Sequence, residues 1–383
     1  MVRTLVILFA GIVPMSGLSA ELPAPPVVMT PQQPVPPSML AWIPGEVRCD
    51  GQPVIASDMR RPYLRLAYGS AQQPMLKPLT YRFRIDAKGR PLSITQDPAG
   101  FAPTAADIGP SLAVSRFPAG REHEGCSISY TARQTLIAET PVEDLVSYSL
   151  APQTGRLPKV GWDRIKPLDS TCRDDPVPAP LTISYPEFKR LKASPGVRDW
   201  SMLQYDLDAN GQPVNVRVAY TTRNAALDDA SIKAVRASRF NEGSRTGCMY
   251  PYWRAPDPLE APPAPDEASF APSDAACENR GAWASKPTLI YPAAYRARSV
   301  EGWAVFMFDV APWGATGNIR VLAAEPSAEF GAQAVQVISA AKTAESATGK
   351  TGCVERVRFV MDGSQAHARK PGDHEDGSWD SVN

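Results

Sequence analysis

Six cysteines are the residues with the clearest capacity for chemistry, because two thiols can oxidise to a disulfide. In chain order they form three pairs whose members lie 77, 76 and 76 residues apart: Cys49 with Cys126, Cys172 with Cys248, and Cys277 with Cys353. Six cysteines allow fifteen pairings, and the regular spacing favours one bridge inside each of three repeats. Such an arrangement is typical of exported proteins, which mature in an oxidising compartment.

Catalytic and metal-binding side chains are scarce by comparison. The three histidines are His123, in a short charged loop, and His367 and His374 near the C-terminus. His123 has no nucleophile motif such as Gly-x-Ser-x-Gly beside it, and the chain has no Cys-x-x-Cys zinc motif. The acidic run at 373–376 could hold a metal weakly, but it is more typical of a solvated tail. The sequence therefore predicts a protein that is not an enzyme, with no catalytic residues, no metal and no cofactor.

The N-terminus has the pattern of a secretory signal, with a basic residue, an apolar run and a small-residue close ending at Ala20. The apolar run is about twelve residues, whereas a membrane-spanning helix needs about twenty. We therefore expect cleavage after Ala20, a periplasmic location and no stable membrane span. The alternative is a protein that stays anchored in the inner membrane and faces the periplasm.

Charge and proline content set the class of partner and the organisation of the chain. Lys plus Arg and Asp plus Glu both number 40, so the electrostatic footprint of a nucleic-acid binder is missing. The 40 prolines concentrate in connecting segments. The expected organisation is a signal peptide (1–20), a Pro-rich spacer (21–40), module 1 (41–135, divergent), a loose connector with one helical turn near Val142 to Ser147 (136–170), module 2 (171–254), a Pro-rich linker (255–272), module 3 (273–362) and a disordered acidic tail (363–383).

Each module has the pattern of a β-hairpin between its two cysteines. Alternating or apolar residues run into Asp-x-x-Gly turns at 86–89 and 208–211, and in module 3 a strand at 304–310 precedes Gly317. The run at 208–211 also begins like a calcium-binding loop, but the later ligands are missing. We therefore predict hairpin turns at Gly89, Gly211 and Gly317.

A long helix and a last strand follow each hairpin. Apolar residues at helical spacing occupy 106–117, 227–240 and 330–341, and the last strand begins at the second cysteine. Tyr-Pro pairs at Tyr185 and Tyr291 predict a short helix before the hairpins of modules 2 and 3. The predicted fold is α+β, with three tandem modules that each have a small antiparallel sheet packed with one long and one short helix. We expect these modules to fold independently, with few contacts made by the linker.

The ordered set of motifs resembles the C-terminal domain of TonB. In module 2 the set is Tyr185-Pro186, the strand at 202–207, Asp208-Ala209-Asn210-Gly211, the Val-rich strand at 214–218, Leu227-Asp228-Asp229-Ala230, and Ala234-Val235 through Phe240. Module 3 matches more loosely, keeping Tyr291-Pro292, Gly302 and Phe308-Asp309-Val310. The resemblance implies a periplasmic domain that binds an extended peptide by adding a strand to its sheet, as TonB does with outer-membrane transporters. The chain departs from the energy transducer in having three domains, a cysteine pair in each, and no intramembrane Ser or His pattern.

The resemblance thus implies a periplasmic protein-binding protein whose partner is an extended segment of an envelope or outer-membrane protein. The alternative is an inner-membrane-anchored TonB-type energy transducer for outer-membrane transport. In the family's arrangement the last strand lies at a sheet edge, where charged residues serve either docking or solubility. Aromatic residues after Cys248 either pack in the core or line a docking edge. The candidate partner-binding residues are Met249, Tyr250, Tyr252, Trp253, Val354, Arg356, Val357 and Arg358.

Overall fold

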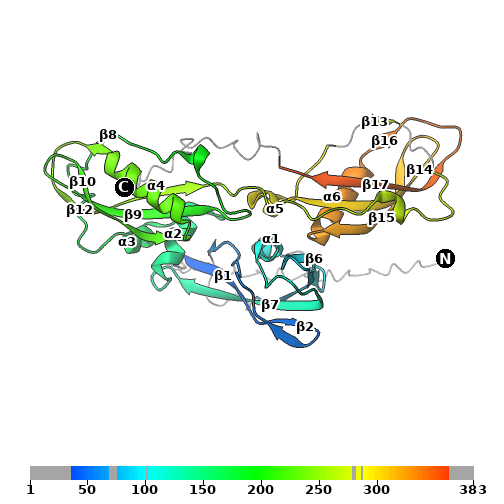
Figure 1. Cartoon of the computed structure of the whole chain (residues 1–383), viewed down its shortest axis with the longest axis horizontal. Helices are drawn as coiled ribbons and strands as arrows, with labels where there is room; N and C mark the ends of the chain where they lie inside the picture. Colours follow the sequence, from blue (N-terminus) through cyan, green and yellow to red (C-terminus); the bar gives the residue numbers. More distant parts are fainter. Residues whose placement is uncertain (1–35, 69–75, 101, 278–281, 286–287, 362–383) are drawn as a thin grey trace, which may run out of the picture. The chain divides into compact units, whose positions relative to one another are not determined.

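The chain folds as a mixed α+β protein in which nearly all strand pairs are antiparallel (Figure 1). The computed structural model describes residues 36–68, 76–100, 102–277, 282–285 and 288–361. The predicted signal peptide, most of the spacer and the acidic tail with its two histidines lie outside these residues. Within the described ranges, no helix has the length and apolar character needed to cross a membrane.

Modules 2 and 3 each contain a three-stranded sheet of the same topology, with the hairpin's first strand in the centre. A long helix follows each hairpin and packs on one face of the sheet. In module 2 the elements are β8 Pro180–Thr182, β9 Asp199–Leu207, β10 Pro213–Thr221, α4 Ala225–Ala237, β11 Arg239–Phe240 and β12 Arg245–Arg254. In module 3 they are β13 Trp283–Ser285, β14 Gly302–Val310, β15 Thr316–Glu325, α6 Ala328–Ser339, β16 Lys342–Thr343 and β17 Lys350–Phe359.

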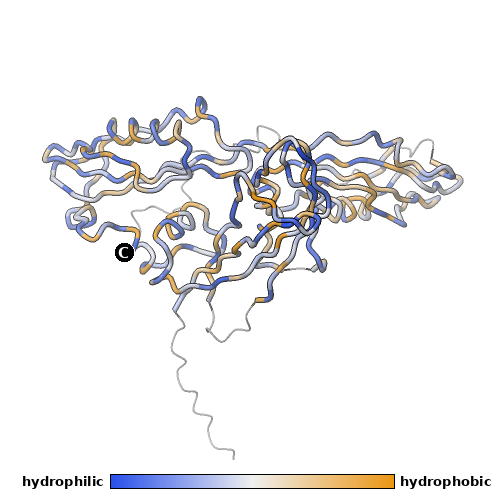
Figure 2. The backbone as a smooth tube through the Cα atoms, turned by 60° about the horizontal axis from the view of Figure 1, so that its bottom comes forward, coloured by the Kyte–Doolittle hydropathy of each residue, from blue (hydrophilic) through white to orange (hydrophobic). Residues whose placement is uncertain are grey.

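Module 1 repeats this order but builds a larger, seven-stranded sheet. Its repeated elements are β5 Leu79–Ile85, β6 Pro91–Asp97, α1 Ile108–Val114 and β7 His123–Leu136, with a short 3₁₀ turn, η1 Pro103–Ala105, before α1. Its additional strands are β1 Ser38–Pro44, β2 Val47–Cys49, β3 Gln52–Val54 and β4 Arg65–Ala67. Strand β1 thus begins inside the segment expected to be the end of the Pro-rich spacer. Figure 2 shows polar and apolar residues alternating along strands, as expected where one face of a sheet is buried.

The short helix predicted before the hairpin occurs in modules 2 and 3 but not in module 1. A 3₁₀ turn, η2 Phe188–Arg190, follows Tyr185, and α5 Ala293–Ala297 follows Tyr291. The corresponding residues of module 1, at 61–64, form no helix and lead directly into β4. The last strands begin three residues before the second cysteine rather than at it.

The three predicted disulfides are present, one per module: Cys49 to Cys126, Cys172 to Cys248 and Cys277 to Cys353. The glycine before each second cysteine has a positive φ, between 56° and 68°, which explains why this position is glycine in all three copies. No free cysteine remains among the described residues.

The turn glycine of module 3 is Gly314, not Gly317 as expected. In each hairpin the turn glycine has a positive φ, and its carbonyl accepts a hydrogen bond from Phe117, Phe240 or Thr343, just beyond the long helix. Gly314 satisfies this pattern with a φ of 82°, whereas Gly317 lies within β15. The misassignment arose because the Asp-x-x-Gly motif of the other hairpins is replaced by Ala311-Pro-Trp-Gly314.

Gly314→Ala should therefore destabilise the protein, whereas Gly317→Ala should not. A Cβ atom on Gly314 would lie 2.2 Å from the Thr343 carbonyl oxygen, while one on Gly317 would have no atom within 4 Å. Strain of this kind costs roughly 1–3 kcal/mol, and unstrained surface substitutions change stability by about 0.5 kcal/mol or less. Urea denaturation of the two variants measures the difference. Equal unfolding midpoints would mean that the turn is not built as described.

The connector at 136–170 is a packed element, in contrast to the loose segment expected. It forms two helices: α2 Val142–Leu150 contains the helical turn expected near Val142 to Ser147, and α3 Lys159–Ile165 was not expected. Leu145 and Val146 are fully buried in a cluster with Met202 of β9 and residues of β1 and β4. The hydrophobic residues of α2 were visible in the sequence, but their partners are far away along the chain. The connector therefore joins modules 1 and 2 through a shared core.

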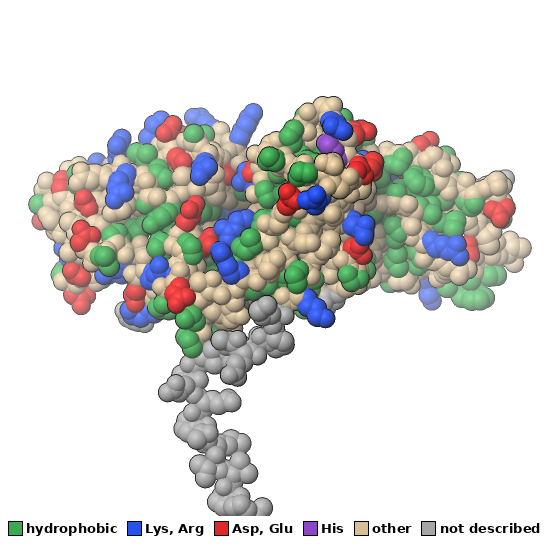
Figure 3. All heavy atoms as spheres, turned by 90° about the horizontal axis from the view of Figure 1, so that it is seen from below, with side chains coloured by type: hydrophobic (Ala, Val, Ile, Leu, Met, Phe, Trp, Pro, Cys, Tyr) green, Lys and Arg blue, Asp and Glu red, His purple; other side chains and the backbone are tan. Residues whose placement is uncertain are grey.

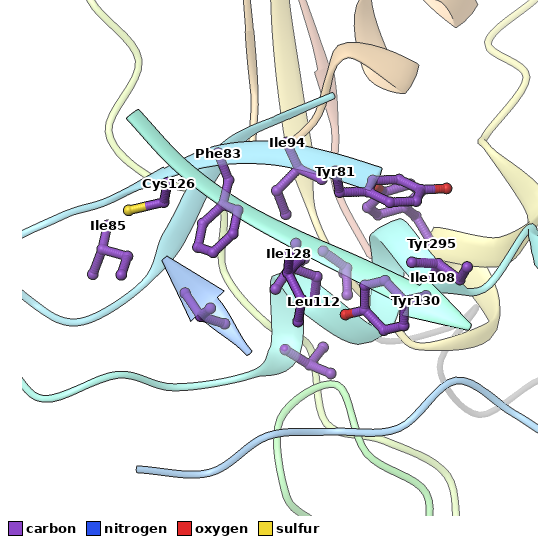
Figure 4. Close-up of a cluster of buried hydrophobic side chains, with 14 of the residues drawn as sticks. Tyr81, Phe83, Ile85, Ile94, Ile108, Leu112, Cys126, Ile128, Tyr130 and Tyr295 are labelled. Carbon is purple, nitrogen blue, oxygen red and sulfur yellow. The ribbon is translucent and has the colours of Figure 1, made fainter. Parts of the chain in front are cut away.

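Modules 1 and 3 also share a hydrophobic core, so the expectation of separate cores is wrong. The largest cluster of buried side chains combines Ile108, Leu112 and Tyr130 of module 1 with Tyr295 and Phe359 of module 3. Figure 4 shows Tyr295 beside Tyr81 and Ile108 within this cluster. The surface that each module presents to the other is apolar, and burying it favours one joint unit.

Two buried polar contacts lie at the same junction. The Arg298 guanidinium donates to both carboxylate oxygens of Asp107 at 2.6 Å and lies 4.0 Å from the centroid of the Tyr63 ring. The Glu325 carboxylate accepts hydrogen bonds from Arg84 and from Ser93. Burial lowers the pKa of a guanidinium, but the Asp107 carboxylate together with Tyr63 and Tyr130 more than offsets this effect and raises the pKa of Arg298 above its ordinary value. The junction therefore has specific charge pairing as well as apolar area.

The Pro-rich linker makes many contacts, although few were expected. Asp257 accepts hydrogen bonds from the Ala193 amide and Arg254, and the Trp303 indole donates to the Pro262 carbonyl at 2.8 Å. A 3₁₀ turn, η3 Glu267–Phe270, follows and lies against β17. Proline content thus indicated the position of the linker correctly. It did not imply that the linker lacks contacts, because prolines can pack and their carbonyls can accept hydrogen bonds.

Candidate functional site

The outer edge of each last strand is the candidate site, because an edge strand offers unpaired backbone groups. In module 1 this edge is filled. The segment at 38–49, comprising β1 and β2, runs antiparallel along β7 from Leu136 to Cys126. Strands β2 and β5 both pair with Cys126 and Ser127, so they lie on opposite sides of β7. The N-terminal segment therefore occupies the side of β7 that faces away from the hairpin.

The outward backbone groups can be identified in all three last strands. Pro251 of β12 lies opposite Met202 of β9. Because proline has no N–H, these two residues cannot form a hydrogen-bonded pair of the antiparallel ladder. Pro251 therefore occupies a non-hydrogen-bonded position, at which its carbonyl points away from β9. Pro251 is the third residue after its cysteine. In module 1 the corresponding residue is Ser129, whose carbonyl accepts a hydrogen bond from Gly45 at 2.8 Å on the outer side. The corresponding residue of β17, Arg356, therefore has outward backbone groups as well.

The outer edge of β12 carries no strand among the residues that the structure describes. The Thr171 amide donates to the Thr246 carbonyl, which closes the end of the edge nearest the disulfide. In the described part of the chain no backbone hydrogen bond reaches the outward groups of residues 249–253. The outward N–H and C=O groups of Met249 and Trp253 and the C=O of Pro251 can therefore pair with an incoming strand.

The outer edge of β17 is partly covered by the linker. The Arg356 side chain donates to the Pro265 carbonyl and forms an ion pair with Glu267 of η3, and Ala276 forms a single bridge to Thr351. As expected, β17 lies at the edge of its sheet. The side chain of Arg356 holds the linker. Val354 is half-buried, Val357 packs against two internal clusters, and Arg358 is exposed.

The aromatic residues of β12 pack against internal clusters of hydrophobic side chains. Tyr252 is buried and Tyr250 packs against the same cluster, on the side of α4. Met249 and Trp253 pack on the opposite face, against the cluster that contains the connector helices, and Arg198 lies 4.6 Å from the Trp253 ring. Of the two roles considered for these side chains, the structure favours packing. Only their backbone remains available at the edge.

Histidine and acidic side chains do not gather into a metal site among the described residues. His123 lies at the start of β7 opposite Ile85, and no group of three or more His, Cys, Asp or Glu side chains in the described ranges could hold a metal ion. On the face shown in Figure 3, Lys and Arg side chains are interspersed with Asp and Glu. That distribution lacks the basic stripe of a nucleic-acid interface.

The strand that fills the edge in module 1 was not predicted from the sequence. Ser38 to Leu40 were assigned to the Pro-rich spacer, although the apolar run from Met39 to Ile43, bounded by Pro44 and Gly45, is a strand signal. Nothing local could have shown that its partner is β7, about 90 residues later in the chain.

In comparisons with known proteins, no family model matches the sequence, and no curated protein matches it.

Proposed function

We propose that this protein is a periplasmic binding protein of the cell envelope that captures an extended segment of another envelope or outer-membrane protein by strand addition. Its three repeats are, in this proposal, modules like the C-terminal domain of TonB. Strand addition uses backbone hydrogen bonds for affinity and the alternating side chains for specificity.

One observation carries the proposal. In module 1 the outer edge of the last strand is occupied by an extended antiparallel segment of the chain itself, while the equivalent edges of β12 and β17 carry no strand among the described residues. Unpaired edges of this kind template further strands. The three disulfides support location in an oxidising compartment, as expected of an exported protein.

Site-specific photocrosslinking in cells tests the proposal. Benzoylphenylalanine placed at Trp253 of β12 or Arg358 of β17 should form adducts with another polypeptide. The matched controls are Arg217 of β10 and Arg320 of β15, which are exposed on the opposite edges of the same two sheets. Adducts from the last strands and not from the controls are expected. Adducts from the controls alone, or from none of the four positions, would contradict strand addition at these edges.

A further inference from the structure

We infer that the docking edge is that of β12 in module 2, and that it takes an extended segment of another polypeptide, antiparallel to β12, with a glycine opposite Pro251. This inference rests on the proposed function and assigns it to one of three edges. The edge of β7 is filled by residues 38–49, and the edge of β17 is partly covered by the linker, which contacts the Arg356 side chain. On β12 the described chain makes a backbone hydrogen bond to the outer edge only at Thr246.

The backbone of β12 restricts what can dock on it. Along the edge, Met249 and Trp253 each present an N–H and a C=O outward, whereas Pro251 between them presents only a C=O. In a regular antiparallel pair, the partner residue opposite Pro251 would offer both a donor and an acceptor. Its N–H would pair with the Pro251 carbonyl, and its own carbonyl would face the proline ring without a donor.

Module 1 shows how the same chain meets this requirement at the equivalent position. The Gly45 amide donates to the Ser129 carbonyl, and no bond between described residues runs back from the Ser129 amide to Gly45. The pairing register shifts by one residue here, because Pro44 pairs with Tyr130 and Arg48 with Ser127. The segment therefore bulges where only the carbonyl of β7 is used.

The same contact explains why the bulge contains glycine. A Cβ atom on Gly45 would lie 2.8 Å from the Ser129 carbonyl oxygen, closer than a carbon atom can approach without displacing the backbone. Pro251 offers the same lone carbonyl at the equivalent position of β12. A bound segment that donates one hydrogen bond to the Pro251 carbonyl and then bulges away from β12 needs a glycine at that position. The residues on either side of the glycine would be extended.

A peptide of the chain's own residues 40–48 is a suitable probe, because it carries the glycine bulge and no cysteine. Labelled with fluorescein and titrated into the full disulfide-bonded protein, it should give saturable anisotropy. Replacing Gly45 of the peptide by sarcosine removes the donor and should weaken binding at least tenfold. N-methylation of Trp42, whose amide is on the side of β1 away from β7, is the matched control and should change affinity less than threefold.

The site is located by a benzoylphenylalanine in place of Ile43 of the peptide, which should label residues 249–254. Labelling within 126–136 instead would mean exchange with the chain's own β1 and would overturn the inference, as would absence of binding at millimolar peptide. Binding that is insensitive to sarcosine at Gly45 would also overturn it. Cellular crosslinks from Arg358 but not Trp253 would retain strand addition while moving it to β17. Absence of cellular crosslinks from both Arg358 and Trp253 would instead contradict the proposed function.

Discussion

Residues 270–362, expressed alone in an oxidising compartment, should fail to fold cooperatively, although they contain a complete hairpin, both helices and a disulfide. In the full chain Tyr295, Val300, Phe330 and Phe359 are fully buried in the cluster that includes α1 and β7. Excision exposes the part of these side chains that faces module 1, and full exposure of one large apolar side chain costs about 1.5–3 kcal/mol. A domain with a net stability of only about 5–15 kcal/mol tolerates little of this loss.

The measurement is chemical denaturation followed by circular dichroism, with dye binding to detect exposed apolar surface. The control is complementation: residues 256–362 co-expressed with residues 36–255 should assemble into a complex that unfolds cooperatively. A fragment at 270–362 that unfolds sharply at the midpoint of the full chain would show that the shared core contributes little.

Arg298→Met should destabilise the full protein by about 3–5 kcal/mol, because it leaves the Asp107 carboxylate in a largely buried site without its partner. The Arg298 side chain is only 3% exposed and that of Asp107 15%. The substitution also removes the hydrogen bond from Arg298 to the Arg61 carbonyl and the contact with the Tyr63 ring. Urea denaturation measures the change in the free energy of unfolding.

The matched control is Arg190→Met, which breaks the ion pair between Arg190 and Glu187, whose side chains are 82% and 70% exposed. Exposed pairs of this kind contribute less than about 1 kcal/mol. The double variant Arg298→Met with Asp107→Asn should recover part of the lost stability, since it removes the unpaired charge. Equal effects of Arg298→Met and Arg190→Met would mean that modules 1 and 3 are not held together by this pair.

Local signals in the sequence determined the disulfide pairing and the main helices and strands between the paired cysteines. Cysteine spacing is sufficient for the pairing because each bridge closes within one repeat. The amphipathic helices α4 and α6 were predictable, since their apolar spacing follows from the geometry of a single helix. The turn in module 3 was misplaced at Gly317, because the identity of the turn glycine depends on its contact with Thr343 and not on the local motif.

The tertiary structure alone decided how the repeats combine and which edges stay open. Tyr295 and Phe359 look like ordinary core residues of their own module, and only their packing against Ile108 shows that the core is shared. The strand at 38–44 is recognisable locally, but its pairing with β7 joins residues far apart in the chain. Backbone hydrogen bonds between strands are independent of side-chain identity, so residue patterns cannot state which strand fills an edge and which edge is left for a partner.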